Sequence, residues 1–83
     1  KSFEENILSF NLFPSVNNGN FTLSLNEKAE EAKVEIINVM GQIVFQKQLQ
    51  NQESSLSLNL IAGAYYARIT QGEKVGVKKF IVQ

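Results

Sequence analysis

The sequence contains no histidine, cysteine, aspartate or tryptophan. Without histidine and cysteine, the chain cannot build a Ser–His–Asp or Cys–His nucleophile system. The same absence removes disulfides and every zinc site made of imidazole or thiolate ligands. General acid–base chemistry would depend on glutamate, lysine or tyrosine alone. The composition therefore favours a domain that is recognised by other molecules over a domain that catalyses a reaction.

Charge and hydropathy argue against a nucleic-acid-binding protein and against a membrane-spanning one. The 83 residues carry eight basic and eight acidic side chains, so the formal net charge is zero. A nucleic-acid partner needs a basic surface, and we expect no such partner. No apolar run approaches the roughly 20 residues that span a bilayer. Because the chain begins with Lys1 and shows no signal peptide, we expect a domain of a longer protein, with any export signal upstream.

Short segments with period-two alternation are the main structural signal. Residues 55–60 alternate serine or asparagine with leucine, and residues 21–26 alternate apolar with polar side chains in the same way. Turns rich in glycine and asparagine separate such segments. We expect about seven strands, which at this spacing predict an all-β, antiparallel sandwich of two sheets. The expected strands are residues 7–13, 21–26, 33–39, 43–49, 55–60, 65–70 and 75–82.

Residues 26–33 are the one segment with helical character, because Asn26 can cap a short turn. The segment is too short for an independent helix, so we expect a connection between the sheets with at most one helical turn. A calcium site is an alternative, since four glutamates lie close in sequence: Glu27, Glu30, Glu31 and Glu35. The segment lacks the aspartate and glycine of a calcium loop. We therefore predict a solvated acidic connection, and no metal or organic cofactor.

The last expected strand changes phase along its length. Val75 and Val77 share one parity, whereas Phe80 and Val82 share the other. Either a bulge lies near Lys78 and Lys79, or both faces of the strand are used. We expect this strand to lie at a sheet edge, where lysines deter pairing with other chains. A recognition role for the same lysines is compatible with that position.

The aromatic residues do not form a carbohydrate platform. Phe10, Phe21, Phe45 and Phe80 follow strand patterns that place them in a core. Tyr65 and Tyr66 are adjacent, so their side chains point to opposite faces of a sheet. We expect one of them to be exposed. The other should be buried, with its hydroxyl bonded to a nearby loop backbone as in a tyrosine corner.

Several short motifs follow one another in a familiar order. They are Leu-Phe-Pro at 12–14, Asn-Gly-Asn-Phe-Thr-Leu at 18–23, residues 34–44, Gly-Ala-Tyr within 60–69, and Lys-Lys-Phe-Ile-Val at 78–82. Together they closely resemble the C-terminal sorting domain of type IX secretion substrates in Bacteroidota-type bacteria. The resemblance extends from about Phe10 to Gln83. Ser15 and Val16 stand where the family usually has Asn-Pro, so the chain lacks a second proline that would stiffen this loop.

The resemblance implies an immunoglobulin-like sandwich that acts as an address label and not as an enzyme. It implies passage through the periplasm and recognition there by the type IX outer-membrane translocon and a shuttle protein. It also implies cleavage by a surface sortase, which leaves the upstream covalent cargo at the cell surface or releases it. The recognition positions carried over from the family motifs are Pro14, Asn18, Gly19, Phe21, Gly63, Tyr65, Lys78, Lys79, Phe80, Ile81 and Val82.

We therefore expect one sorting domain over residues 1–83, with about residues 1–9 as a linker from the cargo. The expected docking surfaces are the final strand, through strand addition, and the turn at residues 17–20. Neither a nucleic acid nor a small-molecule substrate is expected. An exposed final strand can also pair two copies into a weak homodimer. The alternative function is a passive immunoglobulin-like spacer, or an adhesive or carbohydrate-binding module, of a surface protein.

Overall fold

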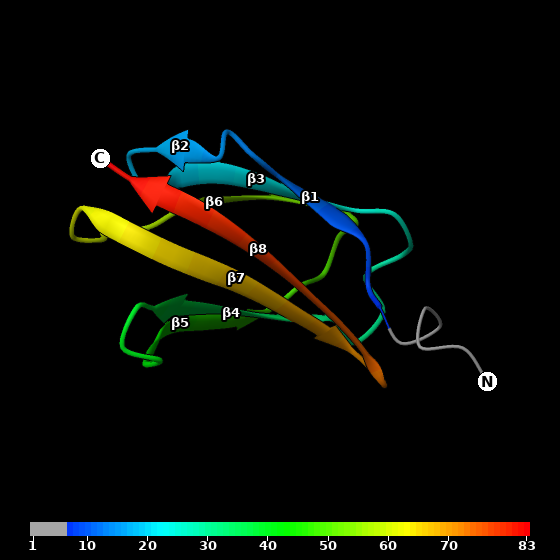
Figure 1. The fold of residues 1–83 in the computed structure, drawn as a ribbon. Coiled ribbons are helices and arrows are strands. Elements are labelled where there is room, and N and C mark those ends of the chain that lie inside the picture. Colours follow the sequence, from blue (N-terminus) through cyan, green and yellow to red (C-terminus); the bar gives the residue numbers. More distant parts are fainter. Residues whose placement is uncertain (1–6) are drawn as a thin grey trace.

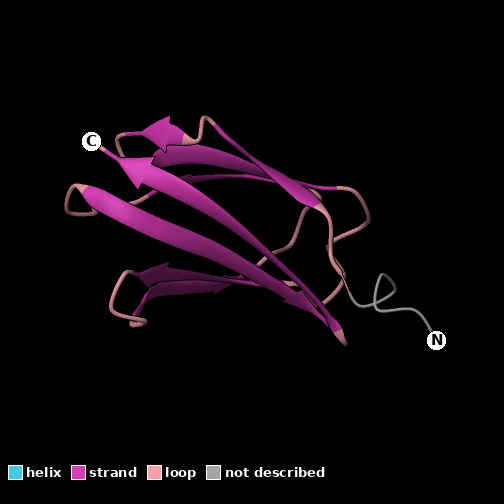
Figure 2. Cartoon of the chain, in the orientation of Figure 1, coloured by secondary structure: helices cyan, strands magenta, loops and turns pink. Residues whose placement is uncertain are grey.

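Two β-sheets face each other across a core of aliphatic and aromatic side chains (Figure 1). The computed structural model describes residues 7–83, and this range consists of strands and loops without a helix (Figure 2). It accordingly contains no helix that could cross a membrane. The strands are β1 (Phe10–Phe13), β2 (Val16–Asn17), β3 (Asn20–Leu25), β4 (Lys33–Asn38), β5 (Ile43–Gln48), β6 (Glu53–Ser57), β7 (Gly63–Gln71) and β8 (Lys74–Val82).

The smaller sheet has the order β1-β3-β6, and the larger sheet has the order β2-β8-β7-β4-β5. All neighbouring strands run antiparallel except β2 and β8, which are parallel. The prediction of an all-β chain in two sheets is confirmed. The structure has one strand more than expected, because the two-residue strand β2 has too few residues to show an alternating pattern.

The first described residues pass from one sheet to the other and back. Ile7 forms a parallel bridge with Val75, and the Leu8 amide donates to the Val75 carbonyl over 3.1 Å. The chain then pairs through β1 with β3 in the smaller sheet and returns through β2 to β8. The linker predicted over residues 1–9 lies mostly outside the described residues. Within them, Leu8 is buried in the core.

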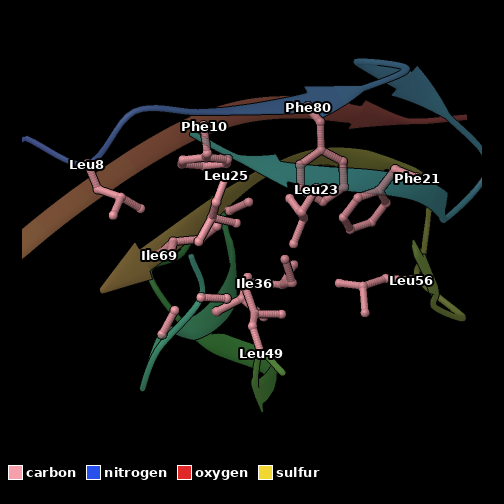
Figure 3. Packing of buried hydrophobic residues seen from close by; sticks show 14 of the residues in the cluster. Leu8, Phe10, Phe21, Leu23, Leu25, Ile36, Leu49, Leu56, Ile69 and Phe80 are labelled. Atoms are coloured by element: carbon pink, nitrogen blue, oxygen red, sulfur yellow. The ribbon is translucent and has the colours of Figure 1, made fainter. Parts of the chain in front are cut away.

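The core forms where the inward faces of both sheets meet (Figure 3). Phe21 of β3 and Phe80 of β8 join the two sheets, with ring centroids 4.7 Å apart. Tyr65 stacks on the other side of Phe80 at 5.7 Å. Leu23, Val34 and Ile36 have no exposed surface. The alternating residues predicted at 21–25 therefore fill the core, whereas Phe45, also expected there, is only partly buried against it.

Strand β8 corrects two predictions. Its pairing with β7 runs without a register shift from Gly63 opposite Val82 to Gln71 opposite Lys74, so the suggested bulge near Lys78 is absent. The phase change arises because both faces are used: Phe80 and Val82 are buried, whereas Val75 and Val77 are exposed on the other face. The prediction that the final strand lies at a sheet edge is wrong, because β8 lies between β2 and β7 in the larger sheet.

Residues 26–32 connect the two sheets without a helical turn, in line with the expectation of at most one, and Ala29 and Ala32 are buried. Two smaller differences concern the end of β6 and the pairing of β4 with β5. Strand β6 ends at Ser57, so the expected continuation to residue 60 is wrong. Leu58 and Leu60 still pack against the core from the following loop, which explains their apolar pattern. A register shift does occur, but between β4 and β5 at Ile36/Ile37.

Candidate recognition surface

The motif positions predicted from the sequence meet at one end of the two sheets (Figure 1). Asn17 of the first motif pairs with Val82 of the last motif. On the other side of β8, Val82 pairs with Gly63 of the middle motif. The Gly19 carbonyl accepts a hydrogen bond from the Leu58 amide at 2.8 Å, which ties the first turn to the loop that leads to β7. We call this region the motif end.

Asn17 organises the first motif; it belongs to the predicted docking turn at residues 17–20, although it is not one of the positions carried over from the family motifs. Its side chain is 8% exposed and makes two hydrogen bonds to the backbone. The Asn17 Nδ2 donates to the Pro14 carbonyl at 2.8 Å, and its Oδ1 accepts from the Gly19 amide at 2.8 Å. An asparagine that binds the backbone two residues on is a frequent turn device. The run Asn-Asn-Gly is thus the signal that could have singled it out.

Several predicted recognition positions are structural. Phe21, Tyr65, Phe80 and Val82 are each at most 7% exposed, so a partner cannot contact their side chains without opening the core. The Tyr65 hydroxyl donates to the Ile61 carbonyl at 2.6 Å, which confirms the predicted tyrosine corner. Tyr66 is the exposed neighbour, as predicted.

Five of the remaining motif positions are accessible to a partner, whereas Gly19 is buried and Ile81 is half-buried. Pro14, Asn18 and Gly63 are exposed at the motif end. Lys78 and Lys79 are exposed in the middle of β8, and they point to opposite faces because Lys78 pairs with inward-facing Ala67. Neither lysine takes part in the ion pairs observed among residues 7–83. Their positive charges are therefore open to an acidic group of a partner.

Between its two covered ends, strand β8 has an open backbone edge. On the side away from β7, pairing within residues 7–83 involves Val75 at one end and residues 81–82 at the other. The Ile81 amide donates to the Ser15 carbonyl at 2.8 Å, which closes the second end. Residues 76–80 have no paired strand on this side among the described residues. Gly76 is buried against the Leu8 backbone, so residues 77–79 are the part of this window where an added strand can form hydrogen bonds.

The outward face of the larger sheet carries an ion pair that sequence reasoning missed. Arg68 of β7 contacts Glu35 of β4, with 2.8 Å between the guanidinium nitrogen and Oε1. Lys33 lies 3.8 Å from the other Glu35 oxygen. The two strands are paired with Glu35 opposite Arg68, a register that cannot be read from either segment alone. The Glu35 side chain is 12% exposed, so this pair stabilises the sheet more than a freely exposed pair would.

The glutamates considered as calcium ligands are separated in the structure. Glu35 belongs to the ion pair on β4, and Glu27 contacts Lys74 at 3.2 Å. Across residues 7–83, no three acidic side chains gather closely enough to hold a metal ion. At the motif end, the loops 17–20 and 58–63 contain only asparagine, glycine and aliphatic residues.

Comparison with known proteins gives one family. The model of the secretion system C-terminal sorting domain matches residues 11–83, which include all eight strands apart from the first residue of β1. Among curated proteins, none is similar enough to count as a match. The match spans the whole arrangement of packed sheets and all three motifs that meet at the motif end.

Proposed function

The chain belongs to the family of type IX secretion C-terminal sorting domains, and we propose that the secretion machinery recognises its folded form. A sorting signal of this type directs a protein through the outer membrane to the cell surface or the extracellular space. The family is not an enzyme family. The observation that carries the proposal is the family match over residues 11–83, which coincides with one pair of packed sheets.

Recognition of the fold, and not of a linear peptide, follows from how the motifs are arranged. Asn17 and Val82 are neighbours only because β2 pairs with β8. Gly63 joins them only through the β7–β8 pairing. An unfolded chain would present the three motifs far apart. We infer that the domain folds as an immunoglobulin-like sandwich in the periplasm, a reading supported by the tyrosine corner between Tyr65 and Ile61.

The translocon and its shuttle protein are the proposed partners, and the middle of β8 is the proposed main contact. Its open edge at residues 77–79 offers backbone groups for strand addition, and Lys78 and Lys79 add positive charge on both faces. Charged rims accelerate association with an oppositely charged partner. The Asn17–Asn20 turn at the motif end is the second contact. The same open edge is the proposed site of weak homodimer formation.

The proposal continues to the fate of the domain. A covalently attached cargo precedes it, and a surface sortase removes the domain after passage through the outer membrane. The cargo then remains at the cell surface or is released. The domain itself supplies no catalytic group to this reaction and needs no cofactor.

The test is a reporter enzyme with a signal peptide and this domain at its C-terminus, expressed in a bacterium with a type IX system. We expect the reporter in the medium or on the cell surface, and its retention in the envelope when the translocon is disabled. Reporter that reaches the surface without the translocon would contradict the proposal. Retention in both strains would favour the alternative of a passive spacer or adhesive module.

The lysines are tested by Lys78→Glu with Lys79→Glu. The matched control is Lys28→Glu with Lys47→Glu, which makes the same charge change at exposed positions outside β8. Because exposed lysines contribute little to stability, the free energy of unfolding of both variants should lie within about 0.5 kcal/mol of the parent value. We expect only the β8 variant to trap the reporter. If it is secreted as well as the control, the lysines do not contact the machinery.

A further inference from the structure

Three of the most exposed apolar side chains of the described residues lie on two loop tips. Val39 and Met40 form the tip of the β4–β5 hairpin, with exposed fractions of 70% and 78%. Ile61, in the loop before β7, is 85% exposed. None of the three belongs to the core cluster. The fold does not need these apolar side chains for its own stability, so their surface is available to a partner.

The hairpin tip has a rigid backbone. The Asn38 Oδ1 accepts hydrogen bonds from the Met40 amide at 2.9 Å and from the Gln42 amide at 3.0 Å. The Asn38 Nδ2 donates to the Gln42 Oε1 at 3.0 Å. Backbone bonds close the same turn, from the Gly41 amide to the Asn38 carbonyl and from the Asn38 amide to the Gln42 carbonyl. Val39 and Met40 are thus presented in a fixed arrangement, which lowers the entropic cost of binding.

The second tip is fixed by the tyrosine corner. The buried Tyr65 holds the Ile61 carbonyl at 2.6 Å, so the backbone that carries the Ile61 side chain is anchored to the core. The two tips lie at the same end of the larger sheet, because Asn38 and Tyr65 are paired and both tips extend beyond this pair (Figure 1). Each of these two loops is therefore held in place by a neighbouring side chain: the hairpin tip by Asn38, and the loop with Ile61 by Tyr65.

These tips continue the motif end. Gly63 follows Ile61 by two residues and pairs with Val82, which in turn pairs with Asn17. The chain enters the described fold at the opposite end, where Ile7 bridges Val75. None of the three loop segments at the motif end, residues 17–20, 38–42 and 58–63, contains a charged residue. The end is apolar and amide-rich, in contrast to the lysines of β8.

We propose that Val39, Met40 and Ile61 insert into an apolar, uncharged pocket of a protein component of the secretion machinery. The proposal rests on the proposed function and adds a third contact, distinct from the β8 edge and from the Asn17–Asn20 turn. A protein pocket is favoured over a lipid surface because membrane-binding faces combine apolar residues with lysine or arginine, and these three loops have neither.

The test uses the reporter fusion with Val39→Thr, Met40→Gln and Ile61→Thr, which keep side-chain size and branching close to the original. The control changes two exposed apolar residues at the opposite end of the sheets, outside the proposed β8 contact: Ile7→Thr and Val75→Thr. We expect the tip variant to slow translocon-dependent secretion at least about tenfold, a change of 1.4 kcal/mol, and the control to be secreted at the parent rate. Both should keep the parent melting temperature.

Each outcome bears on the proposal. Secretion of the tip variant at the parent rate, with secretion of the parent dependent on the translocon, would overturn the inference and leave the proposed function intact. If the triple variant melts early, the single change Met40→Gln decides, and an unchanged secretion rate would again overturn the inference. Parent domain that sediments with zwitterionic lipid vesicles, while the tip variant does not, would show a lipid contact and overturn the assignment to a protein pocket.

Discussion

Replacing Gly19 by alanine should destabilise the domain far more than the loss of one glycine ordinarily does. Gly19 has a φ of 103°, which costs at least about 1–2 kcal/mol for a residue with a Cβ. A Cβ at this position would also lie 2.2 Å from the Leu58 carbonyl oxygen. The obstacle is backbone, so it cannot move aside by a change of rotamer.

Relief of this contact requires the loop after β6 to move away. That movement would break the 2.8 Å hydrogen bond from the Leu58 amide to the Gly19 carbonyl. Leaving these groups unpaired costs about 1–3 kcal/mol. Together with the φ strain, the loss is roughly 2–5 kcal/mol. An 83-residue domain has a total stability of about 4–12 kcal/mol, so the variant should be marginal or unfolded.

Gly41 provides the matched control. It also has a positive φ, of 83°, but a Cβ there would meet nothing within 4 Å. Gly41→Ala should therefore lower the free energy of unfolding only by the backbone strain at positive φ, about 1–2 kcal/mol. For a domain of this size, each kcal/mol corresponds to about 4–8 °C in melting temperature. The difference between the two variants measures the close approach of Gly19 to Leu58.

The assay is thermal and urea unfolding of the parent and both variants, followed by circular dichroism. We expect a drop of about 8–40 °C for Gly19→Ala, and of about 4–16 °C for Gly41→Ala. Equal losses in the two variants would refute the reasoning, because they would mean that the contact between the first turn and Leu58 contributes nothing.

Three further predictions concern the corner, the metal and the domain boundary. Tyr65→Phe removes the 2.6 Å hydrogen bond to Ile61 and should cost about 1 kcal/mol, whereas Tyr66→Phe should change stability by less than about 0.5 kcal/mol; equal effects would argue against the corner. A chelator should leave the melting temperature unchanged, and a drop of several degrees would restore residues 27–35 as a calcium site. Leu8→Ala should cost about 2–4 kcal/mol, because Leu8 is buried; a neutral result would place residue 8 outside the cooperative fold.

The strands were predictable because their alternation is local. Residues 21–25 follow period two, and the structure buries Phe21, Leu23 and Leu25 on one face. The division of Tyr65 and Tyr66 between two faces follows from the same rule. Sheet order was not predictable. It depends on pairings between distant segments, such as Val16 with Ile81, that leave no trace in either segment.

The candidate site shows the same division. The motif order predicted the family, and the family model confirms it. The exposure of some motif residues followed from the same alternation: Phe80 was expected in the core and Lys79 at the surface, and the structure places them there. The phase change in β8 was ambiguous because a bulge and a strand with two used faces produce the same pattern of apolar residues. Hydrogen bonds made by Asn17 and Asn38 depend on turn geometry, which the residue types favour but do not determine.

The position of β8 between β2 and β7 makes the packing of the two sheets depend on residues 74–82. β2 finds its only strand partner, among the described residues, in Ile81 and Val82. β7 pairs along its full length with the same final strand, and Phe80 supplies the ring that joins the sheets. A product that ends before Phe80 would lack the β2 pairing and the Phe21–Phe80 ring contact. We therefore expect such a product not to assemble the two sheets.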